Sequence, residues 1–239
     1  MKTIEQELGQ VVQHLMLYSS FTRNLGLLNG KMGFILFFFK YAKFTKKRLY
    51  KTFAEELIKE IYKDISQNEP IDFENGLCGI AWGFSYLIQN KFIEANEDEV
   101  LKELDIKILE KDVRQITDYS LETGLKGIAY YVISRYNHRK GEHPLIHYKY
   151  IKELVESLTR NEGKDKEIEL LVNKLKEVES SKERNMELPL LDNLIDNVKF
   201  SKKKLFKTNR EDGIARNGYT GIAFKLIKTL QHEKKSIYI

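Results

Sequence analysis

The chain has 239 residues, of which 42% are hydrophobic and 31% are charged. This length can bury a sizeable core, and the composition excludes both a low-complexity tail and a mini-protein held by disulfides. Forty Lys and Arg against 35 Asp and Glu give a net charge of +5, a modest excess that does not demand nucleic acid as a partner.

Cysteine content and apolar runs indicate where the protein acts. Cys78 is the only cysteine, so no disulfide can form within the chain. Glu5 and Glu7 stand where a secretory signal would be apolar. The longest apolar run, residues 32–39, is far shorter than the roughly 20 residues of a membrane helix. We therefore expect a cytoplasmic protein without a membrane span.

The periodicity of apolar residues favours helices, and only three prolines interrupt the chain. In residues 46–66 apolar side chains recur at helical spacing, while Lys and Glu fill the other faces. Asn96 and Glu99 have the spacing of an N-cap pair. In chain order, amphipathic helices are predicted over residues 4–17, 46–66, 97–109, 148–158, 165–178 and 190–198.

A repeated GxxG motif is the most informative feature of the sequence. The segments NGKMGFILFFFKYA, NGLCGIAWGFSYLI, TGLKGIAYYVISRY and NGYTGIAFKLIKTL align without gaps, and their first glycines give a period of about 47 residues. A fifth unit without the motif is expected near Leu171. We expect structural roles for the eight motif glycines, which are Gly30, Gly33, Gly76, Gly79, Gly124, Gly127, Gly218 and Gly221.

Each repeat is interpreted as a turn, a helix that is apolar on most sides, and a charged amphipathic helix. The Asn-Gly pairs suit a positive φ, and the second glycine allows a helix start to approach a neighbour closely. This pattern predicts an all-α fold with two concentric layers, as in an α/α toroid or a curved solenoid. We expect a single domain over residues 1–239.

The motifs carry a resemblance to a known family. GLLNGKMGFILFFFKYA and DFENGLCGIAWGFSYLIQNKFIEANEDEVLKELD resemble lanthionine synthetase C-like proteins, the cyclase family of lanthipeptide biosynthesis. The resemblance implies a toroid of seven helix pairs and a zinc ion that activates a peptide cysteine thiol to attack a dehydrated Ser or Thr. Five units of about 47 residues account for nearly the whole chain, so we expect a reduced or incomplete ring whose open edge would suit a homodimer.

The zinc ligands implied by the resemblance are two Cys and one His in the two positions before the first glycine of a motif. None of these positions holds Cys or His, and Cys78 lies inside its motif, where it is interpreted as a small buried residue. His138, His143 and His147 predict a polar loop and a helix start. We therefore expect no metal. The residues at the ligand positions are Leu28, Asn29, Glu74, Asn75, Glu122, Thr123, Arg216 and Asn217.

Three functional hypotheses remain open. The first is a non-catalytic component of ribosomal peptide modification, which binds a peptide substrate or a peptide-modifying enzyme through a rim formed by Asn29, Asn75, Thr123 and Asn217. The second is zinc-independent hydrolysis of a glycan or peptide, with Glu74, Glu122 and Asp212 as candidate acids and bases. Acidic residues before a helix also stabilise its positive end without any substrate. The third is a structural module for protein interaction.

The remaining clusters have plainer interpretations. The basic stretches 43–48 and 199–210 are expected to be solvated loops, and no nucleic-acid partner is predicted. A set of aromatic residues on the motif helices is expected to belong to the core rather than to a sugar-stacking platform. These residues are Trp82, Phe84, Tyr86, Tyr130 and Tyr131.

Overall fold

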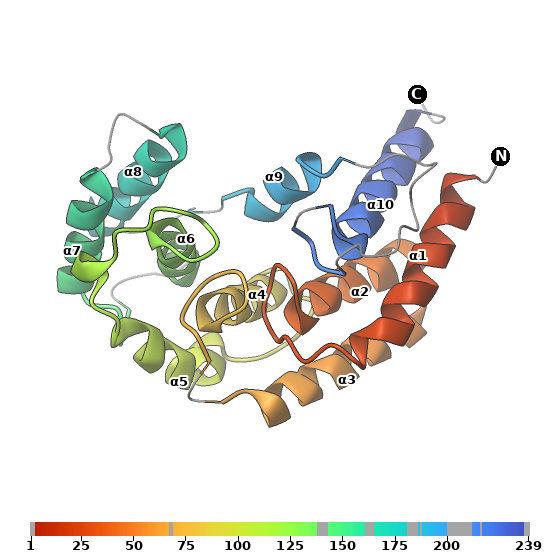
Figure 1. Ribbon diagram of the computed structural model, residues 1–239, viewed down its shortest axis with the longest axis horizontal. Coiled ribbons are helices and arrows are strands. Elements are labelled where there is room, and N and C mark those ends of the chain that lie inside the picture. The colour runs from red at the N-terminus through yellow and green to blue at the C-terminus, as the bar shows by residue number, and fades with distance from the viewer. Residues whose placement is uncertain are drawn as a thin grey trace. The chain divides into compact units, whose positions relative to one another are not determined.

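A computed structural model shows an all-helical protein, which confirms the predicted fold class (Figure 1). It describes residues 3–66, 69–137, 143–160, 165–180, 186, 188–199, 212–215 and 217–236, and within these ranges no strand is present. Its contacts divide the chain into two compact units. The first contains Met1–Ile65 with Pro189–Ile239, and the second contains Ser66–Leu188.

The first unit brings together the two ends of the described chain. Helix α2 packs against α3, and α10 packs against α1, α2 and α9. An edge-to-face contact of Phe37 with Phe224, at 5.4 Å between ring centroids, belongs to the core between α2 and α10. The helices of this unit are α1 (Ile4–Ser19), α2 (Lys31–Thr45), α3 (Arg48–Asp64), α9 (Leu190–Asp196) and α10 (Tyr219–Ser236).

The second unit consists of consecutive segments. Helix α4 packs against α5 and α6, and α8 packs against α6 and α7. The motif helices α4 and α6 are buried on nearly all sides, whereas α5 and α7 bury one face, as the sequence predicts. The helices are α4 (Leu77–Gln89), α5 (Glu97–Leu109), α6 (Leu125–Tyr136), α7 (Tyr148–Thr159) and α8 (Lys166–Ser180), with a 3-10 turn at Val113–Gln115.

The six predicted amphipathic helices all form, with ends within two residues of the prediction. The side chain of Asn96 accepts the Asp98 N–H at 3.1 Å and donates to Glu99 at 3.0 Å, which confirms the N-cap pair. Where the period places a fifth unit, Leu171 is fully buried in α8. Within the described residues, no helix is long and apolar enough to cross a membrane.

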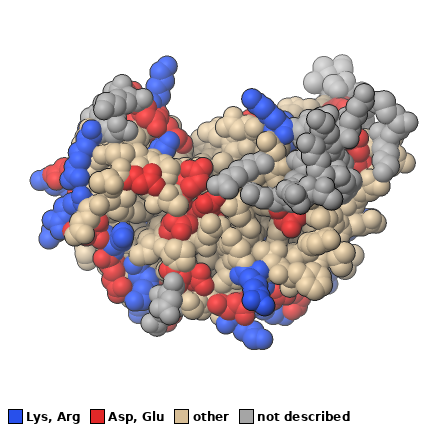
Figure 2. All heavy atoms as spheres, viewed as in Figure 1, with Lys and Arg blue, Asp and Glu red and all other residues tan. Residues whose placement is uncertain are grey.

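The basic stretch 43–48 lies at the end of α2 and the start of α3. Its lysines and Arg48 are exposed, which supports the prediction of a solvated segment. Figure 2 shows basic side chains interspersed with acidic ones over the visible face. Of the second basic stretch, residues 200–210 lie outside the described residues.

The same closed loop precedes three of the motif helices. The first N–H of each helix donates to the carbonyl oxygen of the residue seven positions earlier, and the first glycine of the motif is the N-cap. These bonds satisfy one of the free N–H groups at each helix start. They run from Lys31 to Asn24 (2.9 Å), from Leu77 to Pro70 (2.8 Å) and from Leu125 to Asp118 (2.9 Å).

Close approach, rather than positive φ, explains the N-cap glycines. Gly124 has a φ of −112°, but a Cβ there would lie 2.4 Å from the Asp118 carbonyl oxygen. The expectation that the Asn-Gly pair suits a positive φ is wrong for Gly30 and Gly76, whose φ values are −136° and −112°, and it holds only in the fourth motif, where Asn217 has a φ of 60°. The N-cap glycines Gly30, Gly76 and Gly124 therefore each make room for a backbone oxygen.

Loops of different repeats are joined through one backbone position. In the second unit, the N–H groups of Phe73 and the next residue both donate to the Glu122 carbonyl oxygen, at 2.9 Å each. In the first unit, the N–H groups of Ile214 and the next residue donate to Leu28, at 2.7 and 3.2 Å. Leu28 and Glu122 both stand two residues before the first glycine of their motifs. The fourth motif therefore joins the first motif as the second joins the third.

Candidate functional site

The predicted rim residues of the second unit shape their own loops. Thr123 Oγ1 donates to Asp118 Oδ2 at 2.5 Å, and the Ser120 N–H donates to the other oxygen at 2.8 Å. The hydrogen bond from Thr123, followed by that from Ser120, lowers the pKa of Asp118. The Asn75 N–H donates to Asp72 Oδ1 at 2.7 Å. These contacts give Asn75 and Thr123 roles in the turns before α4 and α6.

The other two rim residues belong to the first unit. Asn217 Oδ1 accepts the backbone N–H of Lys199 at 2.5 Å. Asn29 lies against the fourth motif loop, since a Cβ on Gly213 would be 2.6 Å from the Asn29 Cα. Both residues therefore contribute to the packing of loops in this unit. A peptide-binding role for the four rim residues stays a prediction.

The three candidate carboxylates have different surroundings. Glu74 is 8% exposed, and its N–H donates to the Glu122 carbonyl oxygen, whereas the Glu122 side chain is exposed. Asp212 belongs to the first unit, where its Oδ1 lies 2.7 Å from His14 Nε2. The His14 ring also stacks on Tyr18. An acid–base role for these carboxylates therefore stays a prediction, and for Asp212 the structure offers a binding role within the fold.

We expect the His14–Asp212 bond to fasten α1 to the fourth motif loop. His14→Phe keeps a stacked ring, and Asp212→Ala removes the carboxylate, so each should lower the free energy of unfolding by about 0.5–2 kcal/mol. Because both variants break the same bond, the double variant should lose less than the sum in urea unfolding. Strictly additive losses would show that the bond contributes no stability.

The residues at the expected zinc-ligand positions do not fit a site of two Cys and one His. In the described part of the chain, no group of three His, Cys, Asp or Glu side chains converges as a metal site would require. Cys78 is fully buried in α4, and burial, followed by the charge of Asp72, raises the pKa of its thiol. A cysteine binds a metal as a thiolate, and the raised pKa disfavours the thiolate form of Cys78. Cys78 is therefore a core residue, as predicted.

The histidines of the second unit also serve local structure. His143 is buried, and its Nδ1 accepts the N–H groups of Leu145 and Ile146 at 3.1 Å each. His147 is the N-cap residue of α7. These positions match the predicted polar loop and helix start, while His138 lies outside the described residues.

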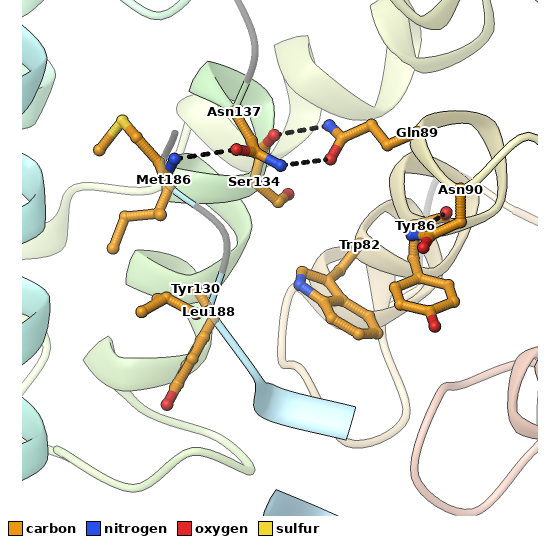
Figure 3. Close-up of a pocket in the computed structure, with 10 residues that line it drawn as sticks. Trp82, Tyr86, Gln89, Asn90, Tyr130, Ser134, Asn137, Met186 and Leu188 are labelled. Atoms are coloured by element: carbon orange, nitrogen blue, oxygen red, sulfur yellow. Dashed lines mark hydrogen bonds between the residues drawn. The ribbon is translucent and has the colours of Figure 1, made fainter. Parts of the chain in front are cut away.

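A pocket of about 120 Å³ lies between the C-terminal halves of α4 and α6 (Figure 3). Trp82 and Tyr130 both stand six residues after the first glycine of their motifs, and they face the pocket from the two helices. Ten residues after that glycine, Tyr86 on α4 corresponds to the smaller Ser134 on α6. The pocket therefore lies between equivalent faces of two motif helices and opens where a large side chain has a small counterpart.

Two amides form the polar side of the pocket. Gln89 Nε2 donates to the Ser134 carbonyl oxygen at 2.8 Å, and Asn137 Nδ2 donates to Gln89 Oε1 at 3.1 Å. The Met186 N–H donates to Asn137 Oδ1 at 2.9 Å (Figure 3). Gln89 Nε2 also reaches Glu97 Oε1 at 3.1 Å. The polar wall is thus held in place by contacts among the protein's own residues.

The sequence-based interpretation of the aromatic residues was right in part. Phe84 and Tyr131 are fully buried core residues, as predicted. Trp82 and Tyr130 are also buried as predicted, but they line the pocket together with the half-buried Tyr86, which stacks on Trp82 at 5.4 Å between centroids. The amides Gln89 and Asn137 were missed, although both stand thirteen residues after the first glycine of their motifs. That shared position was the available signal.

A buried charged network connects α5 to α6 behind this region. Arg135 donates to Asp105 Oδ1 at 3.1 Å and Oδ2 at 2.8 Å, and to Asp98 at 3.0 Å. Tyr131 also donates its hydroxyl to Asp105. Burial lowers the pKa of Arg135, but the hydrogen bonds and charges of Asp105 and its neighbours outweigh this effect and raise it. The guanidinium group therefore stays charged inside the protein.

Comparison with known proteins identifies the family. The family model described as lanthionine synthetase C-like protein matches residues 22–193, which contain the first three motifs. No curated protein and no solved structure matches the chain. The all-helical architecture is consistent with the helical toroid of this family. Since the match covers more than half of the 239 residues, the chain belongs to the lanthionine synthetase C-like family.

Proposed function

We propose that the protein binds peptides in a system of ribosomal peptide modification and does not act as a zinc-dependent cyclase. The observation that carries this proposal is the use made of the expected ligand positions. Leu28 and Glu122 occupy two of these positions, where a cyclase would have Cys or His. Their backbone carbonyl oxygens join the loops of different repeats. The positions that would supply metal ligands in a cyclase therefore hold no zinc-binding Cys or His, while their backbone contributes to the framework.

The partners of this function would be a cytoplasmic peptide substrate or a peptide-modifying enzyme. Hydrolysis by the candidate carboxylates is the weaker alternative. Glu74 is 8% exposed, and Asp212 is engaged by His14, so neither side chain is open to a substrate as Glu122 is. A general acid or base must reach the proton that it transfers.

Metal content and thiol chemistry test the proposal together. Protein purified without a tag or chelator is expected to contain far less than one zinc ion per chain by plasma mass spectrometry. With equimolar zinc added, the protein should not accelerate thiol loss from a peptide that contains cysteine and dehydroalanine. The same peptide, carrying a fluorescent label, should bind saturably in a polarisation assay.

Each outcome has a clear meaning for the proposal. Saturable binding without thiol loss is the expected result. One zinc per chain with accelerated thiol loss would show a cyclase and overturn the non-catalytic assignment. Absence of binding by the labelled peptide would overturn the peptide-binding assignment.

A further inference from the structure

We propose that the pocket between α4 and α6 receives one apolar side chain of a peptide, together with a neighbouring backbone carbonyl group. The inference rests on the proposed peptide-binding function and locates the binding of a peptide side chain in this pocket. The pocket extends from the middle of α4 and α6, at Trp82 and Tyr130, to their C-terminal ends, whereas the GxxG loops lie at their N-terminal ends. It is therefore separate from the positions where the resemblance implies a zinc site.

Trp82 supplies the most specific feature of the pocket. Trp82 is 6% exposed, and no described residue accepts a hydrogen bond from its indole N–H, although this nitrogen is not one of the fully buried unpaired polar atoms. Figure 3 shows the indole nitrogen on the edge of the ring that faces Tyr130 and Leu188. Buried Trp side chains normally have a hydrogen-bond partner. A ligand with a carbonyl oxygen would supply that acceptor.

The polar wall limits the chemistry of the ligand. Most hydrogen-bonding groups of Gln89 and Asn137 are already bonded to each other, to Ser134 or to Met186. Nδ2 of Asn90 donates to the Tyr86 carbonyl oxygen at 3.0 Å, which leaves the side-chain oxygen as an acceptor at the rim. Among the residues that the structure describes, no charged side chain lines the pocket. One unpaired donor in the pocket and one acceptor at its mouth match a peptide group better than a sugar, whose many hydroxyls would lose water without replacement.

The size and walls of the pocket determine the rest of the ligand. A cavity of about 150 Å³ in another protein holds one benzene molecule. A volume of about 120 Å³, open at one side, therefore suits one branched or aromatic side chain rather than a longer segment. The faces of Trp82 and Tyr130, with Leu188 and Met186, provide apolar surface for it. We expect Leu or Phe at this position of the peptide.

Trp82 allows a direct test, because it is the only tryptophan in the chain. The probes are the capped tripeptides acetyl-Ala-Leu-Ala-amide and acetyl-Ala-Phe-Ala-amide, with central Lys or Glu variants and methyl glucoside for comparison. We expect a saturable change in tryptophan fluorescence with the Leu and Phe peptides, and at least about tenfold weaker binding of the charged peptides. A stronger response to the glucoside would overturn the assignment to peptides.

Variants separate this pocket from other sites. Trp82→Phe keeps an aromatic ring and removes the donor, so saturation-transfer NMR should show about fivefold weaker binding of the Leu peptide. Tyr86→Ala, which removes a stacking partner of Trp82, should also weaken binding. Tyr62→Phe alters a tyrosine that is 53% exposed in the first unit and should bind as wild type.

The outcomes also distinguish this inference from the proposed function. Equal binding by wild type and by both pocket variants, with circular dichroism unchanged, would overturn the pocket assignment and leave peptide binding at another place. No binding of either apolar tripeptide to the wild type would likewise overturn the pocket assignment. The proposed function itself is tested separately, by the binding of the labelled peptide that contains cysteine and dehydroalanine.

Discussion

Asp105→Asn is expected to lower the free energy of unfolding by about 2–4 kcal/mol, as measured by urea unfolding followed by circular dichroism. Asp105 is fully buried on α5 and accepts hydrogen bonds from Arg135 and Tyr131 on α6. Asparagine would remove the negative charge and place an amide beside the guanidinium group. Much of the cost is therefore that of a buried cation that has lost its closest counter-charge.

The remaining acids on α5 keep the expected loss below that of a completely broken pair. Asp98 lies 3.0 Å and Glu97 lies 3.2 Å from the Arg135 guanidinium, so the cation retains two partners in the variant. Removal of one partner from a fully buried pair typically costs about 3–5 kcal/mol. The Asn variant should lie at or somewhat below that range.

An exposed pair provides the matched control. Asp112 bonds to Arg114 at 2.8 Å, and these hydrogen bonds, from the side chain and then the backbone, lower the pKa of Asp112 to about 2. Because water screens this pair, Asp112→Asn should lower the unfolding midpoint at neutral pH only slightly, and much less than Asp105→Asn does. Equal losses in the two Asn variants would contradict the assignment of a special role to the buried network.

Helix positions were predictable where local signals agree with burial. Residues 97–109 form a helix with the predicted ends, because Asn96 caps its start and one face is apolar. The repeat predicted which helices are buried on most sides, since α4 and α6 follow GxxG motifs. The reason for the glycines was predicted only in part, because the letters NG do not distinguish a positive φ from close approach to a backbone oxygen.

The buried network and the pocket depend on contacts that the sequence does not encode locally. Charged residues such as Asp105 and Arg135 are usually exposed, and only the packing of α4, α5 and α6 buries them together. His14 and Asp212 are 198 positions apart, and no periodicity links them. The shared motif position of Gln89 and Asn137 was visible, but only the register between α4 and α6 turns it into a hydrogen bond.

Gly127→Ala is expected to lower the free energy of unfolding by at least about 2 kcal/mol, because the added methyl group has no room. A Cβ at this position would lie 2.5 Å from the Leu121 carbonyl oxygen and 2.6 Å from Phe73 Cβ. The first contact is with backbone and the second is with the base of a side chain, so neither can move aside by a rotamer change. Urea unfolding would measure the loss of stability.

The same substitution should also loosen the joint between the second and third motifs. Phe73 donates its N–H to the Glu122 carbonyl oxygen, so displacement of Phe73 should speed hydrogen exchange at this amide. Gly9→Ala is the control, because nothing lies within 4 Å of a Cβ there and alanine favours the interior of α1, with an expected gain of about 0.5–1 kcal/mol. If Gly127→Ala gave a similar gain, the glycines would not be needed for close approach, and the period of about 47 residues would require another physical cause.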